Sequence, residues 1–194
     1  MSRATIERLY SAFRRLDAPA MAACYADDAR FDDEAFSLEG RARIGAMWTM
    51  LCDAVEAKGR DVWQLDVSNI TERSAHWEPT YRFSATGRIV HNVIDAEFEF
   101  DAQGLITRQR DRFDFWRWAR QALGAPGWLL GWTPLLRAKV RAQAAMCGSV
   151  RSICASSSRT TSTGEASRAA YSASSSLALR SWSVVTVTPG FATR

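Results

Sequence analysis

The spacing of apolar residues changes from a helical period to a strand period at Gly59, and this change constrains the fold most. Before it, Ile6, Leu9 and Phe13 are at helical spacing within residues 3–16. After it, four segments rich in β-branched and aromatic residues alternate between apolar and polar positions. Helices followed by a strand meander predict an α+β fold, in which helices pack on one face of a curved antiparallel sheet.

Two further helices are predicted before Gly59. Asp17 can cap a short helix that runs through Tyr25. A third helix begins at Arg41 and ends at Lys58, where Gly59 is suited to terminate it. Together with residues 3–16, these segments supply the helical layer that the sheet needs as a cover.

The four predicted strands are separated by short turn signals. They span residues 62–70, 74–85, 88–100 and 105–114. Thr86-Gly87 and the segment Asp101 to Gly104 are turn sequences short enough for antiparallel hairpins. A curved sheet covered on one face by helices leaves a pocket between the two layers, so an internal binding pocket is expected.

Aromatic residues are concentrated after the last predicted strand. Residues 115–146 contain Trp116, Trp118, Trp128 and Trp132, and Thr133-Pro134 predicts the start of a helix over 134–146. So many large apolar side chains outside the sheet need a surface to cover. We expect 1–114 to form the main α+β barrel and 115–146 to be a helical extension of it that serves as a pocket lid or a homodimer contact.

The net charge of +4 comes entirely from the C-terminal tail. Residues 1–146 contain 20 basic and 20 acidic side chains, whereas 147–194 contain five Arg and Glu165 alone, with 13 Ser. This composition is typical of low complexity, either a flexible arm or an out-of-frame sequence. Nucleic-acid binding is not expected, because it needs a basic patch on a folded face.

Several function classes are excluded by what the sequence lacks. It contains neither an apolar run long enough to span a membrane nor a secretory signal pattern, so a cytoplasmic protein is expected. The four Cys and two His residues show no metal-binding spacing, and no Gly-rich phosphate loop occurs. We therefore expect neither a metal nor a nucleotide cofactor.

Two stretches resemble a known superfamily. YADDARFDDEAF at 25–36, followed by LEG at 38–40, is similar to the helix-to-strand signature of nuclear transport factor 2-like proteins, also called SnoaL-like. FEFDAQGLI at 98–106 and RDRFD at 110–114 resemble their last two strands. The resemblance covers residues 5–146. It implies a cone-shaped α+β barrel that holds a small hydrophobic molecule.

The superfamily includes ketosteroid isomerases, limonene epoxide hydrolases, polyketide cyclases, dehydratases and non-catalytic modules, so the fold alone does not settle the function. Asp33 falls where ketosteroid isomerases keep their general base, although Glu34 replaces their usual proline. A carboxylate beside an apolar pocket is a plausible base, because partial desolvation raises its pKa. The resemblance therefore implies a catalytic role for Asp33.

The remaining ketosteroid isomerase positions do not match. The oxyanion-hole tyrosine position falls on Leu9, with Tyr10 beside it, and the protonated-acid position falls on Ala96, with Asp95 beside it. Without those donors an enolate is unsupported. Ketosteroid isomerase activity itself is therefore not expected.

Asp111 is the second candidate catalytic residue. Strand alternation places it on one face with Leu105, Thr107, Gln109 and Phe113, and points that face into the barrel. It matches one aspartate of the water-activating set of epoxide hydrolases and the late-strand acid/base of polyketide cyclases. The other partners of both sets lack counterparts here, and a buried structural carboxylate stays an alternative.

The candidate ligand-binding residues are aromatic or carry one polar group, and they face the same pocket: Tyr25, Trp48, Trp77, Tyr81, Asn92 and Phe113. His76 and His91 fall on the opposite faces of their strands, as expected of surface histidines. Two functions remain open. One is cofactor-free acid/base chemistry on a small hydrophobic molecule by Asp111, assisted by Asp33; the other is a non-catalytic ligand-binding or dimerisation module.

Overall fold

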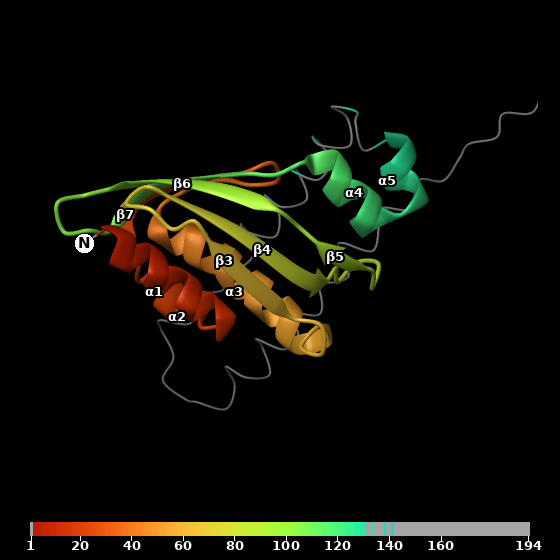
Figure 1. The fold of residues 1–194 in the computed structure, drawn as a ribbon, viewed down its shortest axis with the longest axis horizontal. Coiled ribbons are helices and arrows are strands. Elements are labelled where there is room, and N and C mark those ends of the chain that lie inside the picture. Colours follow the sequence, from red (N-terminus) through yellow and green to blue (C-terminus); the bar gives the residue numbers. More distant parts are fainter. Residues whose placement is uncertain (1, 131–132, 134–137, 139–140, 142–194) are drawn as a thin grey trace, which may run out of the picture.

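The computed structural model describes residues 2–130, 133, 138 and 141, and Figure 1 shows helices on one side of a curved sheet. In chain order the elements are α1 (Ser2–Arg14), α2 (Ala18–Ala22), β1 (Tyr25–Asp32), β2 (Ser37–Glu39), α3 (Arg41–Lys58), β3 (Gln64–Ser68), β4 (Ser74–Arg82), β5 (Ile89–His91), β6 (Ile94–Phe100), β7 (Ile106–Arg112), α4 (Phe115–Leu123) and α5 (Ala125–Leu130). The predicted α+β fold is confirmed.

The sheet follows the order β2-β1-β7-β6-β4-β3, and β5 also pairs with β4. It is curved and does not close into a full barrel. Its strand pairs are antiparallel except for β1 and β7, which run parallel. The strands predicted after Gly59 pair antiparallel as expected, whereas β1 and β2, which precede α3, and the parallel pairing of β1 with β7 were not among the strands predicted from periodicity. A parallel pair needs a long connection, which no local turn sequence encodes.

All three predicted helices of the helical layer are present, and the second is shorter than predicted. The Asp17 carboxylate accepts from the Ala20 N–H at 3.1 Å and caps α2, as expected. The prediction that this helix reaches Tyr25 was wrong, because α2 ends at Ala22. The chain joins the sheet there, since the Cys24 carbonyl accepts from the Ile106 N–H at 2.9 Å.

The predicted strand over 88–100 is divided into β5 and β6. The division lies opposite Pro79 of β4, which has no N–H to donate to a ladder. The Pro79 carbonyl still accepts from the Asn92 N–H at 3.0 Å, which holds the interrupted segment in place. Every second residue from Val90 to Phe98 is buried, so the predicted inward face is kept across the break.

The two predicted turns are present. Gly87 and Gly104 have φ angles of 72° and 78°, a backbone region that strongly favours glycine. In the second turn the Asp101 carboxylate accepts from the Gln103 and Leu105 N–H groups, both at 2.9 Å. These local interactions set the hairpin that brings β6 and β7 together.

A bulge in β7 changes which residues face the core. Ile106 pairs with Phe100 and Arg108 with Glu99, so Thr107 is an extra residue on β7. Gln109 and Asp111, which follow the bulge, are buried as predicted. At the start of the strand, however, Ile106 is buried, while Leu105 and Thr107 are only half-buried. The expected alternation was therefore wrong at the start of the strand.

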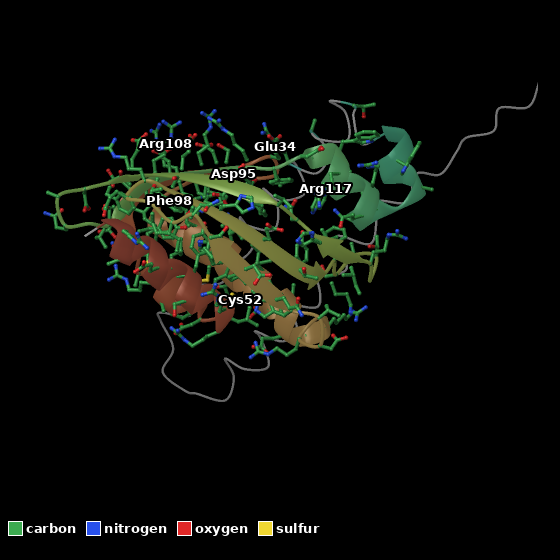
Figure 2. All side chains as sticks on the ribbon, in the orientation of Figure 1. Glu34, Cys52, Asp95, Phe98, Arg108 and Arg117 are labelled. Carbon is green, nitrogen blue, oxygen red and sulfur yellow. The ribbon has the colours of Figure 1, made fainter. Side chains whose placement is uncertain are left out.

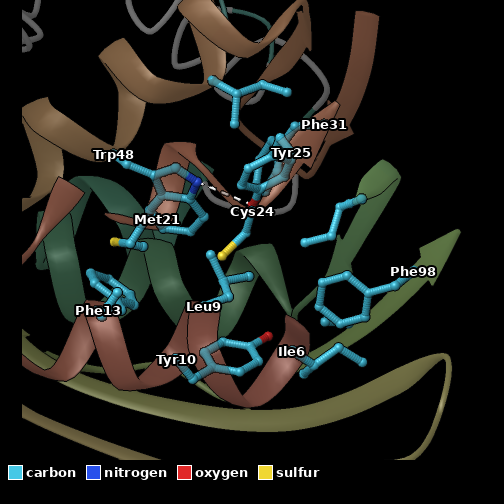
Figure 3. Packing of buried hydrophobic residues seen from close by; sticks show 14 of the residues in the cluster. Ile6, Leu9, Tyr10, Phe13, Met21, Cys24, Tyr25, Phe31, Trp48 and Phe98 are labelled. Atoms are coloured by element: carbon cyan, nitrogen blue, oxygen red, sulfur yellow. Dashed lines mark hydrogen bonds between the residues drawn. The ribbon is translucent and has the colours of Figure 1, made fainter. Parts of the chain in front are cut away.

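The core lies between the helices and the concave side of the sheet, and it is rich in aromatic rings (Figure 3). Phe13 and Trp48 lie 5.1 Å apart by ring centroid, and Tyr10 and Trp77 lie 5.7 Å apart. Figure 2 shows Phe98 on this inner side, and Asp95 and Arg108 on the outer side of the sheet. Polar side chains on the concave face of the sheet are therefore surrounded by apolar side chains.

The aromatic-rich extension begins with two helices at one end of the sheet (Figure 1). Asp114 caps α4 by accepting from the Arg117 N–H at 3.0 Å. Trp118 and Phe115 of α4 pack with Phe83 and Val90 in a second, smaller cluster. The predicted helix over 134–146 lies almost entirely outside the described residues, and the tail over 147–194 lies wholly outside them.

Within the described ranges, no helix is both long and apolar enough to cross a membrane. This finding is consistent with the absence of long apolar runs in the sequence.

The bulge makes a testable distinction between two adjacent residues. Ile106→Ala should lower the free energy of unfolding by about 2–5 kcal/mol, because it removes a fully buried side chain. Leu105→Ala should cost less, since Leu105 is only half-buried. Urea denaturation of both variants measures the difference. A larger loss for Leu105→Ala would contradict the bulge.

Candidate functional site

A cavity of about 540 Å³ lies between α3 and the sheet. This volume is within the range of small-molecule binding sites. Its wall is largely aromatic, with contributions from α3, β4, β7, α4 and the segment before β2. Glu56 and Ala57 of α3 belong to the lining and are exposed, so the cavity reaches the surface beside the C-terminal half of α3.

Seven of the eight residues predicted for the site line this cavity: Asp33, Trp48, Trp77, Tyr81, Asn92, Asp111 and Phe113. They come from elements that are distant in the sequence. Tyr25 does not line the wall. Its side chain is fully buried behind it and contacts the wall residue Trp48 and the neighbouring Gln109 through hydrogen bonds.

Asp111 is a buried carboxyl group with one hydrogen-bond donor among the described residues. It is 4% exposed, and its Oδ1 accepts from Gln109 Nε2 at 2.9 Å. Burial raises the pKa of Asp111 well above its ordinary value, the Gln109 hydrogen bond lowers it, and the charge of Asp33 raises it further. Burial therefore favours the neutral, protonated form of Asp111.

Asp33 is in a different local environment. Its Oδ1 accepts from the Ala35 N–H at 2.6 Å and the Phe36 N–H at 2.5 Å. Burial raises the pKa of Asp33 to about 6, and the two backbone hydrogen bonds oppose this rise by stabilising the charged form. Arg141 donates to the main-chain oxygens of Asp33 and Glu34, and its charge also lowers the Asp33 pKa.

The two carboxyl groups on one cavity therefore differ in their tendency to ionise. The pKa of Asp33 is raised to about 6, so its carboxylate form is available near neutral pH to accept a proton, while burial favours the neutral form of Asp111, which can donate a hydrogen bond or a proton. Their charges act on each other, since the charge of Asp33 raises the pKa of Asp111. Titratable groups whose environments push their pKa values apart are suited to paired acid and base roles.

A chain of buried hydrogen bonds ends at Asp111. Trp48 Nε1 donates to the Tyr25 hydroxyl at 3.1 Å, as the dashed line in Figure 3 shows. The Tyr25 hydroxyl lies 2.5 Å from Gln109 Oε1, and Gln109 Nε2 donates to Asp111. We refer to Trp48, Tyr25, Gln109 and Asp111 as the buried relay; each of them is at most 4% exposed.

Gln109 was not among the predicted site residues, although strand alternation placed it on the face of Asp111. The available signal was that a buried amide needs partners for both its oxygen and its nitrogen. Which partners it meets depends on β1 and α3, and the sequence alone does not bring those elements beside β7.

The aromatic extension contributes a second missed residue. Trp118 of α4 lines the cavity, and its Nε1 donates to the Tyr81 hydroxyl at 2.9 Å. Burial raises the pKa of Tyr81 to about 12, so the hydroxyl stays protonated. On the same wall, the buried Trp77 Nε1 has no hydrogen-bond partner within the described residues.

Tyr10 lies close to the site without forming part of its wall. It is 2% exposed, and its hydroxyl has no hydrogen-bond partner in the described part of the chain. Burial, and then the charge of Asp111, raise the pKa of Tyr10 well above its ordinary value. Tyr10 therefore senses Asp111 electrostatically but makes no hydrogen bond within the buried relay.

The histidines lie on the other side of the sheet. His76 Nδ1 is 2.7 Å from Asp95 and its Nε2 is 3.0 Å from Glu78, while His91 Nε2 is 2.9 Å from Glu78. These contacts raise the pKa of His76, chiefly through the hydrogen bond to Asp95. Neither histidine lines the cavity. Over the described ranges, no group of three or more His, Cys, Asp or Glu side chains is arranged to hold a metal ion.

Comparison with solved structures shows what the architecture resembles. A provisionally assigned isomerase from Rhodopseudomonas palustris is 16% identical, with a TM-score of 0.51 over 62% of this chain and 96% of that one. A provisionally assigned polyketide cyclase from Pseudomonas putida is 23% identical, with a TM-score of 0.48 over 62% and 98%. A ketosteroid isomerase-like protein from Erwinia carotovora is 18% identical, with a TM-score of 0.42 over 58% and 92%.

At these identities the structural matches bear on the fold alone. Among curated proteins no match is found. The family model described as the SnoaL-like domain matches residues 6–109, which is more than half of the chain. This match includes most of α1, all of α3 and most of the sheet that forms the cavity. The chain therefore belongs to the SnoaL-like family, within the nuclear transport factor 2-like superfamily.

Proposed function

We propose that this protein binds a small hydrophobic molecule in the cavity and moves a proton on it, with Asp33 as the base and Asp111 as the acid. The observation that supports this most is the pair of carboxyl groups on one largely apolar wall, of which Asp33 is hydrogen-bonded by two backbone N–H groups that favour its charged form and Asp111 is more deeply buried, which favours its neutral form. The apolar lining favours a hydrophobic ligand, and it strengthens electrostatic interactions within the site.

The chemistry follows from these charge states. The Asp33 carboxylate removes a proton from a carbon next to a carbonyl group of the ligand. The electron pair of that C–H bond moves to the carbonyl oxygen, and the neutral Asp111 donates a hydrogen bond to it. Return of the proton from Asp33 to the same or another carbon completes an exchange or an isomerisation, and no cofactor takes part.

This assignment changes the emphasis of the sequence-based interpretation, in which Asp111 acts and Asp33 assists. The hydrogen bonds to Asp33 Oδ1 come from two backbone N–H groups, which favour its ionised form. Asp111 has a single amide donor and deeper burial. Asp33 is therefore the better base at neutral pH, and Asp111 is the better donor.

The test uses the full chain and a probe that fits an aromatic cavity. 2-Acetylnaphthalene carries a methyl group next to a carbonyl, so exchange of its methyl protons in D2O can be followed by NMR. We expect the protein to accelerate this exchange over buffer, and methyl ketones of other sizes extend the search. Binding of the ketones without any exchange would support the non-catalytic ligand-binding module instead.

Replacing Asp33 should separate its chemical role from its structural role. Asp33→Asn keeps an oxygen that can accept from Ala35 and Phe36 but removes the base, so exchange should fall about 10²-fold or more. NMR exchange rates and urea denaturation, measured on the same samples, check this. Glu34→Gln, a change at the adjacent residue, serves as the matched control. Equal rates for wild type and Asp33→Asn would contradict the assignment of Asp33 as the base.

The raised pKa of Asp33 also predicts how stability depends on pH. The folded state holds this proton up to about pH 6, whereas the unfolded chain releases it near 3.8, so the free energy of unfolding should fall as pH rises between those values. Asp33→Asn removes this loss. Relative to wild type, the variant should gain up to about 3 kcal/mol at pH 7 compared with pH 3. Denaturation at pH 3, 5 and 7 would show a constant difference if the Asp33 pKa were unshifted.

A further inference from the structure

We propose that Trp48, Tyr25 and Gln109 are positioning residues that determine which oxygen of Asp111 carries the proton, and thereby require a ligand with a hydrogen-bond acceptor. This inference rests on the proposed function, in which Asp111 contacts the ligand. It concerns the direction of the hydrogen bonds in the buried relay, which follows from counting donors and acceptors.

The direction is set at Trp48. An indole N–H can only donate, so the Tyr25 oxygen must accept from it at 3.1 Å. The Tyr25 hydroxyl then has its own proton to place, and Gln109 Oε1 is 2.5 Å away. This short separation suits an O–H···O bond better than an N–H···O bond. Tyr25 therefore donates to the amide oxygen of Gln109.

The opposite orientation of the Gln109 amide leaves a buried group unpaired. If Gln109 Nε2 faced Tyr25, the Tyr25 oxygen would accept from both Trp48 and Gln109. Its own O–H would then have no acceptor, in a residue that is fully buried. An unsatisfied buried donor loses its hydrogen bonds to water without replacement, which disfavours this orientation. The Trp48 indole thus selects one amide orientation for Gln109, although it does not contact Gln109 in the relay.

The consequence reaches the cavity through Asp111. With its oxygen turned to Tyr25, Gln109 presents Nε2 to Asp111 Oδ1 at 2.9 Å, and that oxygen must accept. The proton of the neutral carboxyl group is therefore on Oδ2, the oxygen that the relay does not use. Asp111 lines the cavity, so it offers an O–H donor there.

The opposite orientation of the Gln109 amide would reverse which group of Asp111, donor or acceptor, is offered to the ligand. Gln109 Oε1 would face Asp111 and take its proton, which would leave an acceptor oxygen for the ligand. Among the described residues, the other titratable groups that interact electrostatically with Asp111 do not donate a hydrogen bond to its carboxyl group. Asp33 raises its pKa, and Tyr10 and Tyr25 are neutral phenols whose own pKa values are raised. The relay therefore favours carbonyl, ether or epoxide oxygens over ligands that offer only donors.

The test compares probes that differ in one acceptor. 2-Acetylnaphthalene and 2-isopropylnaphthalene have similar shapes, but only the first carries a carbonyl oxygen. We expect the full-length protein to bind the ketone about fivefold to tenfold more tightly, as one hydrogen bond of about 1 kcal/mol implies. Titration calorimetry measures both affinities. A ratio near one in the wild-type protein would overturn the inference.

Tyr25→Phe and Tyr10→Phe form a matched pair. Both residues are buried tyrosines whose pKa values respond to Asp111, but only the Tyr25 hydroxyl is hydrogen-bonded in the relay. Tyr25→Phe should bring the affinity ratio towards one, while Tyr10→Phe should leave it unchanged. Asp111→Asn should keep much of the preference, because an asparagine amide can accept from Gln109 and still donate to the ligand. Equal ratios in the two phenylalanine variants would contradict the relay.

A second measurement needs no ligand. The carbonyl stretch of the neutral Asp111 carboxyl group can be identified by infrared difference spectra against Asp111→Asn. It should shift in Tyr25→Phe and not in Tyr10→Phe, and a stretch unaffected by Tyr25→Phe would overturn the inference even if no probe bound. Proton exchange on 2-acetylnaphthalene reports the proposed function separately. If the protein catalysed proton exchange but bound the ketone and the hydrocarbon equally, only the inference about the relay would be contradicted. If it preferred the ketone but catalysed no exchange, only the catalytic proposal would be contradicted.

Discussion

The buried relay connects the helical layer of the protein to its sheet at the point where the cavity begins. Trp48 belongs to α3, Tyr25 to the first residue of β1, and Gln109 and Asp111 to β7. Each hydrogen bond satisfies a polar atom that would otherwise be unpaired in an aromatic core. The same contacts hold α3 in register with the parallel pair β1–β7, and α3 and the sheet together form the cavity.

The ionisation behaviour of the site depends on the fact that the relay ends at Asp111, on the cavity wall. Beyond Asp111 the wall is largely apolar, and burial raises the pKa of this carboxyl group well above its ordinary value. Asp33 lies on the same wall, but backbone N–H groups compensate part of the burial and its pKa rises to about 6. Two identical side chains therefore acquire different tendencies to ionise from differences in burial and hydrogen-bond partners. This arrangement destabilises the folded state at neutral pH, which is common where function requires a buried ionisable group.

A second tryptophan–tyrosine hydrogen bond joins α4 to the cavity wall. There α4 folds back on the sheet, and its Trp118 donates to the Tyr81 hydroxyl. The aromatic extension thus completes the wall with a residue that lies outside the span matched by the family model. The shape of the binding site is therefore not a property of the matched domain alone.

Much of this architecture can be predicted from local sequence patterns. The helical spacing over residues 3–16 and 41–58 gave two helices close to their observed bounds, and the turn glycines Gly87 and Gly104 were found by their short turn sequences. These elements were predictable because each depends on residues within one turn or one strand. Asp33 and Asp111 were selected from a family resemblance and from strand alternation; both line the cavity, and their catalytic roles stay predictions.

The remaining features depend on contacts between distant segments. The parallel pairing of β1 with β7, the bulge at Thr107 and the partners of Gln109 each require two or three elements to be in place at once.

The sequence by itself determined the α+β class, the helices over 3–16 and 41–58, the strands that follow Gly59, and the inward-facing position of Asp111. Apolar periodicity and turn residues act locally, and local interactions can be seen in a linear chain. Only the tertiary structure decided that β1 and β2 precede α3 in the sheet, that Tyr25 lies behind the cavity wall, that Trp118 lies on it, and that the pKa values of Asp33 and Asp111 are raised to different extents. Desolvation and hydrogen-bond partners set those pKa values, and both come from packing against residues far away in the chain.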